Sequence, residues 1–361
     1  MARTPTVQDV ARLAGVSRQT VSNVLNNPDV VRDVTRERVL EAVRGLGYRP
    51  HAAARQLRTR RSSAIAVHLD PYAGGISGVV LDRFVHALAE RASARGMRVL
   101  VYTAQNAEEE ISRVEDLLDG GEVDAVVISG TIHDDPRTAW LRQHQVPFAS
   151  FGRPWGAEGL AEPHPWVDVD AAAGTEAATR HAIEAGAHRV AFLGWPAGSG
   201  TGDDRETGWR RATAAPPGSN GAGHADGLGV AGERIAVADD VSAARSALGE
   251  VLARDAADAV VCASDVLAIG AHLAALDAGR PELPVYGFDN TPTADALGLS
   301  SVEQHPEHVA TAVLELLMGE AGTAVLPEAE LGGTRHRLVT PQLVVRSPYP
   351  HPGADSHPHH R

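Results

Sequence analysis

Four polar residues with hydrogen-bonding side chains lie close together in the stretch GVSRQTVSNVLN, residues 15–26, and they are Arg18, Gln19, Ser22 and Asn23. The apolar residues of this stretch are spaced for burial along the other side of a short helix, and they are Val16, Val21, Val24 and Leu25. Long side chains with forked donors and acceptors suit the edges of base pairs. An ordinary solvated helix would carry similar residues, so the surrounding sequence has to decide.

The residues around this stretch predict a helix-turn-helix. Thr6, followed three residues later by an acidic residue, is typical of a helix N-cap, and we expect a first helix over VQDVARLA. Gly15 ends that helix, and Ser17 caps a second one over RQTVSNVLN. After the loop NNPDVV we expect a third helix that starts at Thr35, runs through RERVLEAVRGLG and ends at its glycines.

Charge divides the chain into two parts. Residues 1–61 hold 12 Arg and 5 Asp or Glu, a balance of +7, whereas the remainder holds 21 Arg and 41 acidic residues, a balance of −20. The chain contains no lysine. A basic segment before an acidic body is the asymmetry expected of a DNA-binding head on a domain that does not bind DNA.

Composition excludes several classes of protein. A length of 361 residues indicates two or three folding units. The single cysteine, Cys262, lies in the apolar run DAVVCAS, and we expect a buried thiol rather than a disulfide or a metal ligand. No apolar run approaches the roughly 18–20 residues that span a membrane, and the N-terminal residues lack the apolar core of a secretory signal. We therefore expect a cytoplasmic protein with no membrane partner.

The segment YRPHAAARQLRTRR links this head to the rest of the chain. Pro50 blocks continuation of the third helix, and HAAARQLR is too short to be a stable helix alone in water. A marginal helix rich in Ala and Arg suits folding on DNA, with Leu57 as a wedge between base steps of the minor groove. A flexible linker whose Leu57 packs on the third helix is the alternative.

The stretches TVQDVARLAGVSRQTVSNVLN, TRERVLEAVRGLGYRP and AARQL resemble the head and hinge of the lactose-repressor (LacI/GalR) family of bacterial transcription regulators. The resemblance implies a homodimer that places two recognition helices in successive major grooves of a pseudo-palindromic DNA operator. It also implies two hinge helices that insert Leu57 and its symmetry mate at a central base step and bend the DNA.

By position, the resemblance places Arg18, Gln19 and Asn23 where the family reads bases, and Arg58 as a minor-groove contact after Leu57. Arg18 can donate two hydrogen bonds to a guanine edge and Gln19 can pair with adenine. Asn23 replaces the larger residue of several family members, which leaves its base preference open. Hydroxyl side chains and amides at helix N-termini suit phosphates. The hydroxyl residues in question are Thr6, Ser17, Thr20 and Ser22.

From Ala64 onward, short apolar runs alternate with helical stretches. The runs that predict strands are AIAVHL, MRVLVYT, VDAVVIS, PFASFG, WVDVD, RVAFLGW, RIAVA, DAVVCAS and LPVYGFD. The stretches that predict helices are GVVLDRFVHALAERASARG, EEEISRVEDLLDGG, AAAGTEAATRHAIEAGA and VSAARSALGEVLARDA. This alternation indicates two parallel sheets covered by helices. The resemblance continues here and implies an α/β periplasmic-binding-protein-like body of two parallel-sheet subdomains, with an effector in the cleft between them.

We predict a helix-turn-helix head over residues 1–50, a hinge helix over 51–61, and an effector-binding and dimerisation domain over 62–347. The resemblance implies three crossovers between its subdomains, near residues 160–165, 289–293 and 322–328. Subdomain 1 would comprise about 62–162 and 292–323, and subdomain 2 about 163–291 and 324–347.

Two further segments of low complexity are visible. The helix that contains GWRRATA must stop near Ala215, because residues 215–233 are rich in Gly and Pro and predict a long loop. Residues 348–361 are rich in His and Pro and predict a disordered tail rather than a metal site.

Polar residues at the ends of the predicted strands are candidates for the cleft. Arg205 in DDRETGW matches the arginine that opens the family's R-x-x-G-[FW] motif, and a guanidinium can hold two ligand oxygens. Asp289 in YGFDNT matches the family's aspartate at a strand end, where a carboxylate can accept from sugar hydroxyls. The further candidates are Asp70, Arg153, Ser264 and Asp265. A structural ion pair is the alternative for the charged residues, and Asp265 could instead cap the next helix.

Four tryptophans lie close to these candidates, and they are Trp155, Trp166, Trp195 and Trp209. Aromatic faces stack on the apolar face of a sugar, but each of these rings could equally belong to the core. We select Trp195 as the first candidate. Forked charged groups with aromatic platforms favour a carbohydrate effector over a purine or an amino acid.

The sequence therefore predicts a sequence-specific DNA-binding transcription regulator, a repressor of sugar-uptake or catabolism genes that a carbohydrate releases from its operator. A co-repressor mode with a nucleoside, a purine or another metabolite is the alternative, and a solute-binding protein is a more distant one. An enzyme is not expected, because GWPAGSGTG lacks the lysine of a phosphate-binding loop and no nucleophile elbow occurs. We expect neither a cofactor nor a metal.

Overall fold

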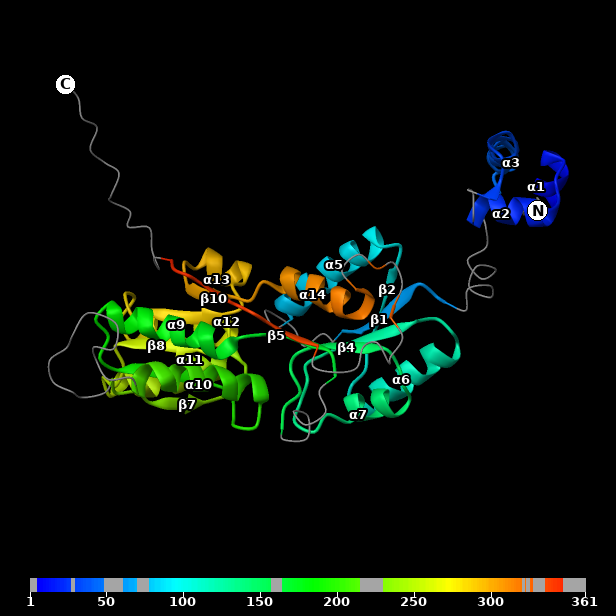
Figure 1. Cartoon of the computed structure of the whole chain (residues 1–361). Helices are drawn as coiled ribbons and strands as arrows, with labels where there is room; N and C mark the ends of the chain where they lie inside the picture. The colour runs from blue at the N-terminus through cyan, green and yellow to red at the C-terminus, as the bar shows by residue number, and fades with distance from the viewer. Residues whose placement is uncertain are drawn as a thin grey trace, which may run out of the picture. The chain divides into compact units, whose positions relative to one another are not determined.

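The structure is a computed structural model that describes residues 5–26, 30–48, 61–69, 78–156, 164–214, 230–319, 322, 325–326 and 335–346. Contacts between Cα atoms divide the chain into two units, residues 1–62 and residues 63–361. In the first unit the described helices are α1 (Val7–Ala14), α2 (Arg18–Asn26) and α3 (Asp33–Leu46), which Figure 1 draws in dark blue. We call this unit the head and the second unit the body.

The head folds as a helix-turn-helix with a third supporting helix, as predicted. Thr6 and Asp9 form a reciprocal capping box at the start of α1. Gly15 follows α1 with a φ of 62°, a left-handed conformation that suits glycine and turns the chain into α2. One expectation was wrong: α3 begins at Asp33, two residues before Thr35, and no side chain caps its first turn.

A small core holds the three head helices together. Val10 of α1, Val21 of α2 and Val39 of α3 are completely buried and belong to one apolar cluster. Val16 and Leu25 pack against that cluster while remaining partly exposed. The apolar residues of α2 therefore face the core, which leaves its polar residues on the outside.

The first sheet of the body has the strand order β11-β5-β4-β3-β1-β2, with every pair parallel. Its strands are β1 (Ala64–His68), β2 (Arg98–Tyr102), β3 (Ala125–Ser129), β4 (Phe148–Phe151), β5 (Trp166–Val169) and β11 (His336–Val339). The helices that pack on it are α5 (Val79–Ala94), α6 (Ala107–Asp119), α7 (Pro136–Gln143) and α14 (Pro306–Met318). Alternate residues of β1 serve the two faces: Ile65 lies in the cluster with α5 and α14, and Ala66 in the cluster with α6 and α7.

The second sheet has the order β12-β10-β9-β8-β6-β7, and its edge strand β12 runs antiparallel to β10. Its strands are β6 (Val190–Gly194), β7 (Arg234–Ala236), β8 (Ala259–Cys262), β9 (Val285–Phe288), β10 (Ser300–Glu303) and β12 (Gln342–Val344). Its helices are α9 (Ala171–Glu184), α10 (Gly200–Ala214), α11 (Val241–Ala253), α12 (Asp265–Asp277) and the short α13 (Pro292–Ala296). Helix α9 packs on α10, and α11 packs on α12.

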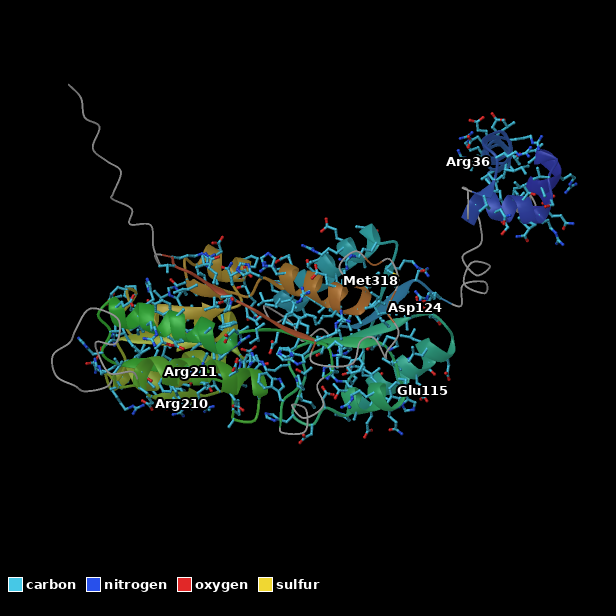
Figure 2. The ribbon with its side chains drawn as sticks, in the orientation of Figure 1. Arg36, Glu115, Asp124, Arg210, Arg211 and Met318 are labelled. Carbon is cyan, nitrogen blue, oxygen red and sulfur yellow. The ribbon has the colours of Figure 1, made fainter. Side chains whose placement is uncertain are left out.

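Several body helices, among them α6 and α10, are amphipathic, which fixes their rotation about their axes. On α6 Val114 is buried whereas Glu115 is exposed, and on α10 Trp209 is buried whereas Arg210 and Arg211 are exposed, as Figure 2 shows for the labelled charged residues. No helix among the described residues is both long and apolar enough to cross a membrane. Cys262 is a buried free thiol, as expected.

The two sheets exchange strands at different places from those predicted. β5 continues the first sheet beside β4, so the first crossover follows Val169 rather than residues 160–165. β10 belongs to the second sheet, so the second crossover lies between Glu303 and α14 rather than at 289–293. The third lies between β11 and β12, after Val339, rather than at 322–328. The predicted subdomain boundaries were therefore wrong, since an apolar run does not reveal which sheet it joins.

All nine predicted strands of the body are present, as are the four helices predicted between them, which are α5, α6, α9 and α11. Helix α10 ends at Ala214, as expected. Residues 215–229 of the predicted loop and the predicted tail 348–361 lie outside the described residues. The sequence patterns did not single out β10, β11, β12, α7, α13 and α14.

Candidate functional site

In the head, the outer side of α2 carries the residues that the sequence predicts to contact DNA. Ser17 caps α2, because its Oγ accepts a hydrogen bond from the amide of Thr20 at 3.0 Å. Gln19 donates from Nε2 to Oδ1 of Asn23, one turn further along, at 3.1 Å. Arg18 and Gln19 are exposed, and Arg18 forms no hydrogen bond or ion pair with any residue that the structure describes. Its guanidinium is therefore available to an external ligand.

The other predicted DNA contacts have different surroundings. The Thr6 hydroxyl donates to Oδ2 of Asp9 at 2.7 Å, so it is engaged in the cap of α1, and Ser22 is half-buried. Leu57 and Arg58 lie outside the described residues, as does the effector candidate Asp70. Their roles remain predictions.

In the body, a cavity of about 310 Å³ lies between the carboxyl ends of the strands of the two sheets. The polar residues that line it from the first sheet are Ser129, Thr131 and Asp168. Those that line it from the second sheet and its helices are Thr201, Arg205, Asp239, Asp289 and Gln304. The size and the mixture of polar and apolar walls are typical of small-molecule sites.

Arg205 lies on α10 with its guanidinium held at the cavity wall. Its Nη1 donates to the carbonyl of Ala263 and lies 3.8 Å from Oδ1 of Asp289. The guanidinium lies over the Phe288 ring, 3.8 Å from its centroid, and 5.2 Å from the centroid of Trp195. Burial lowers the pKa of Arg205 from its ordinary value. Its Nε is buried without a protein partner among the described residues, so this atom has a hydrogen bond to give.

The motif around Arg205 explains why it points to the cavity. Gly208 lies against the backbone of α9, where any Cβ would overlap the carbonyl of Ala172. Trp209 fills the core beside Phe192 and donates from Nε1 to the Val190 carbonyl at 2.9 Å. Glycine at this place lets α10 lie close to α9, and the tryptophan fixes the rotation of α10. Arg205 lies one turn before Trp209 on the same side of the helix.

Asp289 directly follows β9 and faces Arg205. Its φ is 115°, a strained value for a residue with a side chain, and its amide donates to the carbonyl of Val302 at 2.9 Å. Its Oδ1 accepts from Nε2 of Gln304 at 2.6 Å. Burial raises the pKa of Asp289 to about 7, although the nearby Arg205 lowers it. Asp289 therefore changes protonation near neutral pH.

Of the four tryptophans, Trp195 lines the cavity. Its carbonyl accepts from Nη2 of Arg234 at 2.8 Å, and Nε of the same arginine donates to Glu206 at 2.6 Å, which ties the loop after β6 to α10. Trp209 belongs to the core, and Trp166 is buried and stacks on His336 with a centroid distance of 4.7 Å. Trp155 packs against Gly200 at the start of α10.

Arg153 does not line the cavity, contrary to our expectation. Its Nε donates to Asp168 of β5 at 2.6 Å, and its Nη2 donates to Asp204 of α10 at 3.2 Å. Nη2 also donates to the carbonyl of Val169. Arg153 therefore forms structural ion pairs, which was the alternative considered for this residue. Arg153 links the first sheet to a helix of the second.

Ser264 and Asp265 also serve the fold rather than the cavity wall. Ser264 is the N-cap of α12, and its hydroxyl donates to Oδ1 of Asp239 at 2.5 Å. Asp265 is completely buried, and it accepts from the Ser301 hydroxyl and from the Thr291 amide, each at 2.6 Å. The expectation that either residue lines the cleft is corrected. Asp265 does not cap α12, since Ser264 does.

The sequence reasoning missed several cavity residues. Asp239 stands in VADDV and Asp168 in WVDVD, both at or near the carboxyl end of a predicted strand, which was the available signal. Gln304 follows β10, a strand that the sequence patterns did not single out. To predict that Asp168 and Gln304 line the cavity, the strands β5 and β10 would have had to be assigned to the correct sheets.

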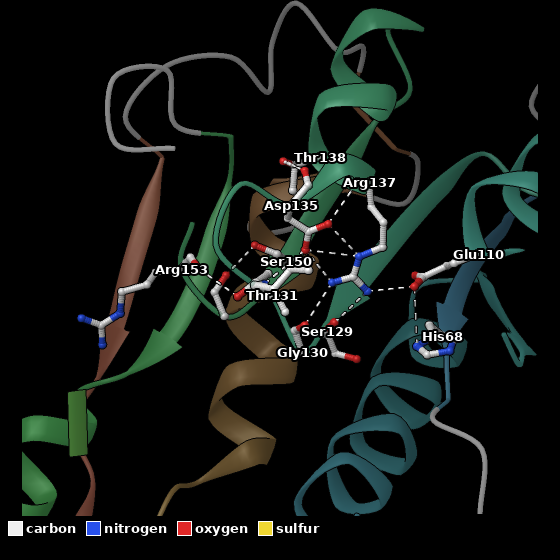
Figure 3. Close-up of polar contacts among 12 residues, drawn as sticks. His68, Glu110, Ser129, Gly130, Thr131, Asp135, Arg137, Thr138, Ser150 and Arg153 are labelled. Atoms are coloured by element: carbon white, nitrogen blue, oxygen red, sulfur yellow. Dashed lines mark hydrogen bonds and ion pairs between the residues drawn. The ribbon is translucent and has the colours of Figure 1, made fainter. Parts of the chain in front are cut away.

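A buried charged network, drawn in Figure 3, contacts the residues at the end of β3 that line the cavity. Arg137 of α7 forms ion pairs with Asp135 at 2.6 Å and with Glu110 of α6 at 2.8 Å. It also donates to the carbonyls of Ser129 and Gly130 at 3.1 and 3.0 Å, where β3 meets the cavity. The two carboxylates neutralise the buried guanidinium of Arg137. The guanidinium in turn holds the backbone at the end of β3 through charged hydrogen bonds.

Comparison with known proteins accords with this architecture. Residues 6–51 match the family described as bacterial regulatory proteins, lacI family, and residues 80–320 match the periplasmic binding proteins and sugar binding domain of LacI family. The HTH-type transcriptional regulator CelR of Thermobifida fusca is 34% identical over 333 residues, which are 88% of this chain and 92% of that protein.

Two solved structures extend the comparison. A complex of the transcriptional regulator CelR with cellobiose has a TM-score of 0.64 and 28% identity, and covers 96% of this chain and 100% of its own. The lac repressor dimer bound to operator and the anti-inducer ONPF has a TM-score of 0.75 at 24% identity, covers 96% of this chain and 99% of its own, and is similar in fold.

Proposed function

Because this chain belongs to the LacI family of bacterial regulatory proteins and is a DNA-binding transcription regulator, we propose that it is a repressor that a carbohydrate releases from its operator. The observation that carries the proposal is the cavity in which Arg205 and Asp289 lie beside Trp195. A guanidinium and a carboxylate together complement hydroxyl groups, which both accept and donate, and an indole face suits the apolar face of a pyranose.

We propose that Arg205, Asp289 and Trp195 contact this effector. Asp70 is retained as a proposed contact, and Asp168 and Asp239 are added because they line the cavity. The relative CelR has been solved with cellobiose, so β-linked glucose disaccharides are the first sugars to test.

On the DNA side, we propose that Arg18, Gln19 and Asn23 read base edges from α2. Thr6, Ser17, Thr20 and Ser22 would hold phosphates. The exposure of Arg18 and Gln19 on a helix whose apolar side is buried supports this assignment. We propose a homodimer on a pseudo-palindromic site, with Leu57 as the minor-groove wedge and Arg58 beside it.

The proposed mechanism needs binding and no catalysis. An effector that touches both sheets favours one relative orientation of the two, because its affinity differs between orientations. That orientation changes the separation of the paired hinge segments in the dimer. Hinge segments that no longer pair bind DNA more weakly.

A selection for bound genomic DNA fragments, repeated with mono- and disaccharides that include cellobiose, tests this function. We expect a palindrome that one sugar releases. If the protein binds the palindrome more tightly in the presence of a sugar, the sign of the coupling is reversed. If no sugar changes the affinity for the palindrome, the proposal of a carbohydrate effector is contradicted. Failure to enrich any sequence would contradict the assignment of the head.

A further inference from the structure

The charge of the cavity wall limits the kind of carbohydrate that can bind, an inference that rests on the proposed function. Three carboxylates line the cavity, those of Asp168, Asp239 and Asp289. Among the described residues that line it, Arg205 is the one cation. The site therefore carries an excess of negative charge before any ligand enters.

Two of these carboxylates have cationic partners. Asp168 is paired with Nε of Arg153 at 2.6 Å. Asp289 lies 3.8 Å from Arg205 and accepts from Gln304 at 2.6 Å. The single guanidinium at the wall is thus already directed toward a carboxylate, and little positive charge is left for an anionic ligand.

Asp239 differs from the other two. It follows β7, and its Oδ1 accepts from the Ser264 hydroxyl at 2.5 Å, which fixes the orientation of the carboxylate. It forms no salt bridge with any residue of the described ranges. Its second oxygen has no protein donor there, so it is free to accept a hydrogen bond from a ligand. Asp239 is exposed, and the cation that acts on it is Arg205, at a distance beyond that of a salt bridge.

We propose that the effector is a sugar without a phosphate or other anionic group and that Asp239 determines this specificity. A sugar hydroxyl donates to the open oxygen of Asp239, and a neighbouring hydroxyl accepts from Nε of Arg205, which lacks a protein partner. A phosphoryl group beside Asp239 would meet a like charge that no salt bridge neutralises, and this repulsion disfavours binding although solvent screens it at the exposed carboxylate.

The test uses the full-length protein and matched pairs of ligands: cellobiose with cellobiose 6′-phosphate, and glucose with glucose 6-phosphate. Tryptophan fluorescence and calorimetry give each dissociation constant. We expect at least one neutral sugar to bind about tenfold more tightly than its phosphate, since solvent screens the repulsion at the exposed Asp239. Binding of a phosphate as tight as that of its neutral partner, or tighter, would overturn the inference and leave the carbohydrate effector intact. Binding of no compound in the panel would overturn the carbohydrate effector and this inference with it.

The variant Asp239→Asn tests the residue. Asparagine keeps an oxygen that accepts from Ser264, so the fold should persist, while the negative charge is lost. We expect weaker binding of the neutral sugar and a ratio of neutral to phosphorylated affinity that falls from about tenfold toward one, because a hydrogen bond to a charged group is lost and a repulsion is removed. The control Asp116→Asn removes an equal charge from an exposed position on α6 and should leave the ratio unchanged. A ratio that Asp239→Asn does not alter would overturn its role.

Discussion

Replacing Arg205 with methionine should abolish the effector response and preserve both the fold and operator binding. The residue is buried, and its guanidinium lies over Phe288 and beside Trp195. Burial lowers the pKa of Arg205, which means that the unliganded fold holds this charge in the cavity against a desolvation penalty. Methionine keeps an unbranched apolar chain against Phe288, so the free energy of unfolding should fall by only about 1–3 kcal/mol, for the Ala263 carbonyl that loses its donor.

The loss of affinity follows from the contacts of the guanidinium. Its Nη1 lies 3.8 Å from Asp289, and two unit charges at that distance attract by about 4 kcal/mol at an effective dielectric constant of about 20. Without this attraction the pKa of Asp289, already raised to about 7, rises further, so its carboxyl is protonated at neutral pH. A sugar then loses hydrogen bonds to two charged groups, each worth about 1.5–3 kcal/mol. The dissociation constant should rise by about 10²–10⁴-fold.

The assay is release of the full-length protein from a fluorescent operator by the sugar found in the selection, followed by anisotropy, with thermal unfolding of each variant in parallel. Arg211→Met is the matched control, since Arg211 is exposed on the same helix. An Arg205→Met protein that responds to sugar like wild type would refute a ligand contact by this guanidinium. A large fall in melting temperature or lost operator binding would show instead that Arg205 supports the fold.

Three further predictions concern the DNA contacts and pH. Leu57→Ala should weaken specific operator binding and reduce DNA bending in gel-shift assays with no change in thermal unfolding; unchanged affinity would exclude the wedge. Arg18→Ala should cost about 1–3 kcal/mol and relax one symmetric base position in a binding-site selection, whereas a uniform loss over all sequences would mark a phosphate contact. Sugar affinity should rise as pH rises through about 7, by about tenfold per unit below the pKa, because the raised pKa of Asp289 requires loss of a proton before it accepts from a hydroxyl. The same raised pKa makes the unliganded fold lose stability over the interval from the ordinary pKa of a carboxyl to about 7, and Asp289→Asn should flatten both profiles.

The elements of this fold were largely predictable from hydrophobic patterning, whereas the pairing of strands was not. β5 and β10 lie in different sheets from those expected, because parallel strands buried on both faces read as similar apolar runs wherever they pair. β11 is short and largely exposed and β12 is short and partly exposed, so they lack the apolar signal of the central strands. Helix α14 is buried on most sides, which removes the amphipathic period that marks α6.

The residues of the candidate site were likewise only partly predictable from the sequence. Arg205, Asp289 and Trp195 were predicted from a motif and from positions after strands, and they line the cavity. Arg153 and Asp265 satisfied the same rule but are held by partners that only the tertiary structure supplies, namely carboxylates for the first and an amide and a hydroxyl for the second. Position at a strand end therefore indicates where a polar side chain lies, and not whether the protein itself satisfies it.

The contacts of Arg153 provide a route by which a ligand in the cavity acts on both sheets. Asp168 belongs to the cavity wall and also holds Arg153, which in turn donates to Asp204 on α10. The same helix carries Arg205 one residue later, so one sugar that contacts Asp168 and Arg205 engages both ends of this link. Because Asp204 also accepts from the Ala172 amide at the first crossover, a shift of α10 changes contacts where the chain passes between the sheets. Differential affinity for two arrangements of this link is what effector-driven coupling requires.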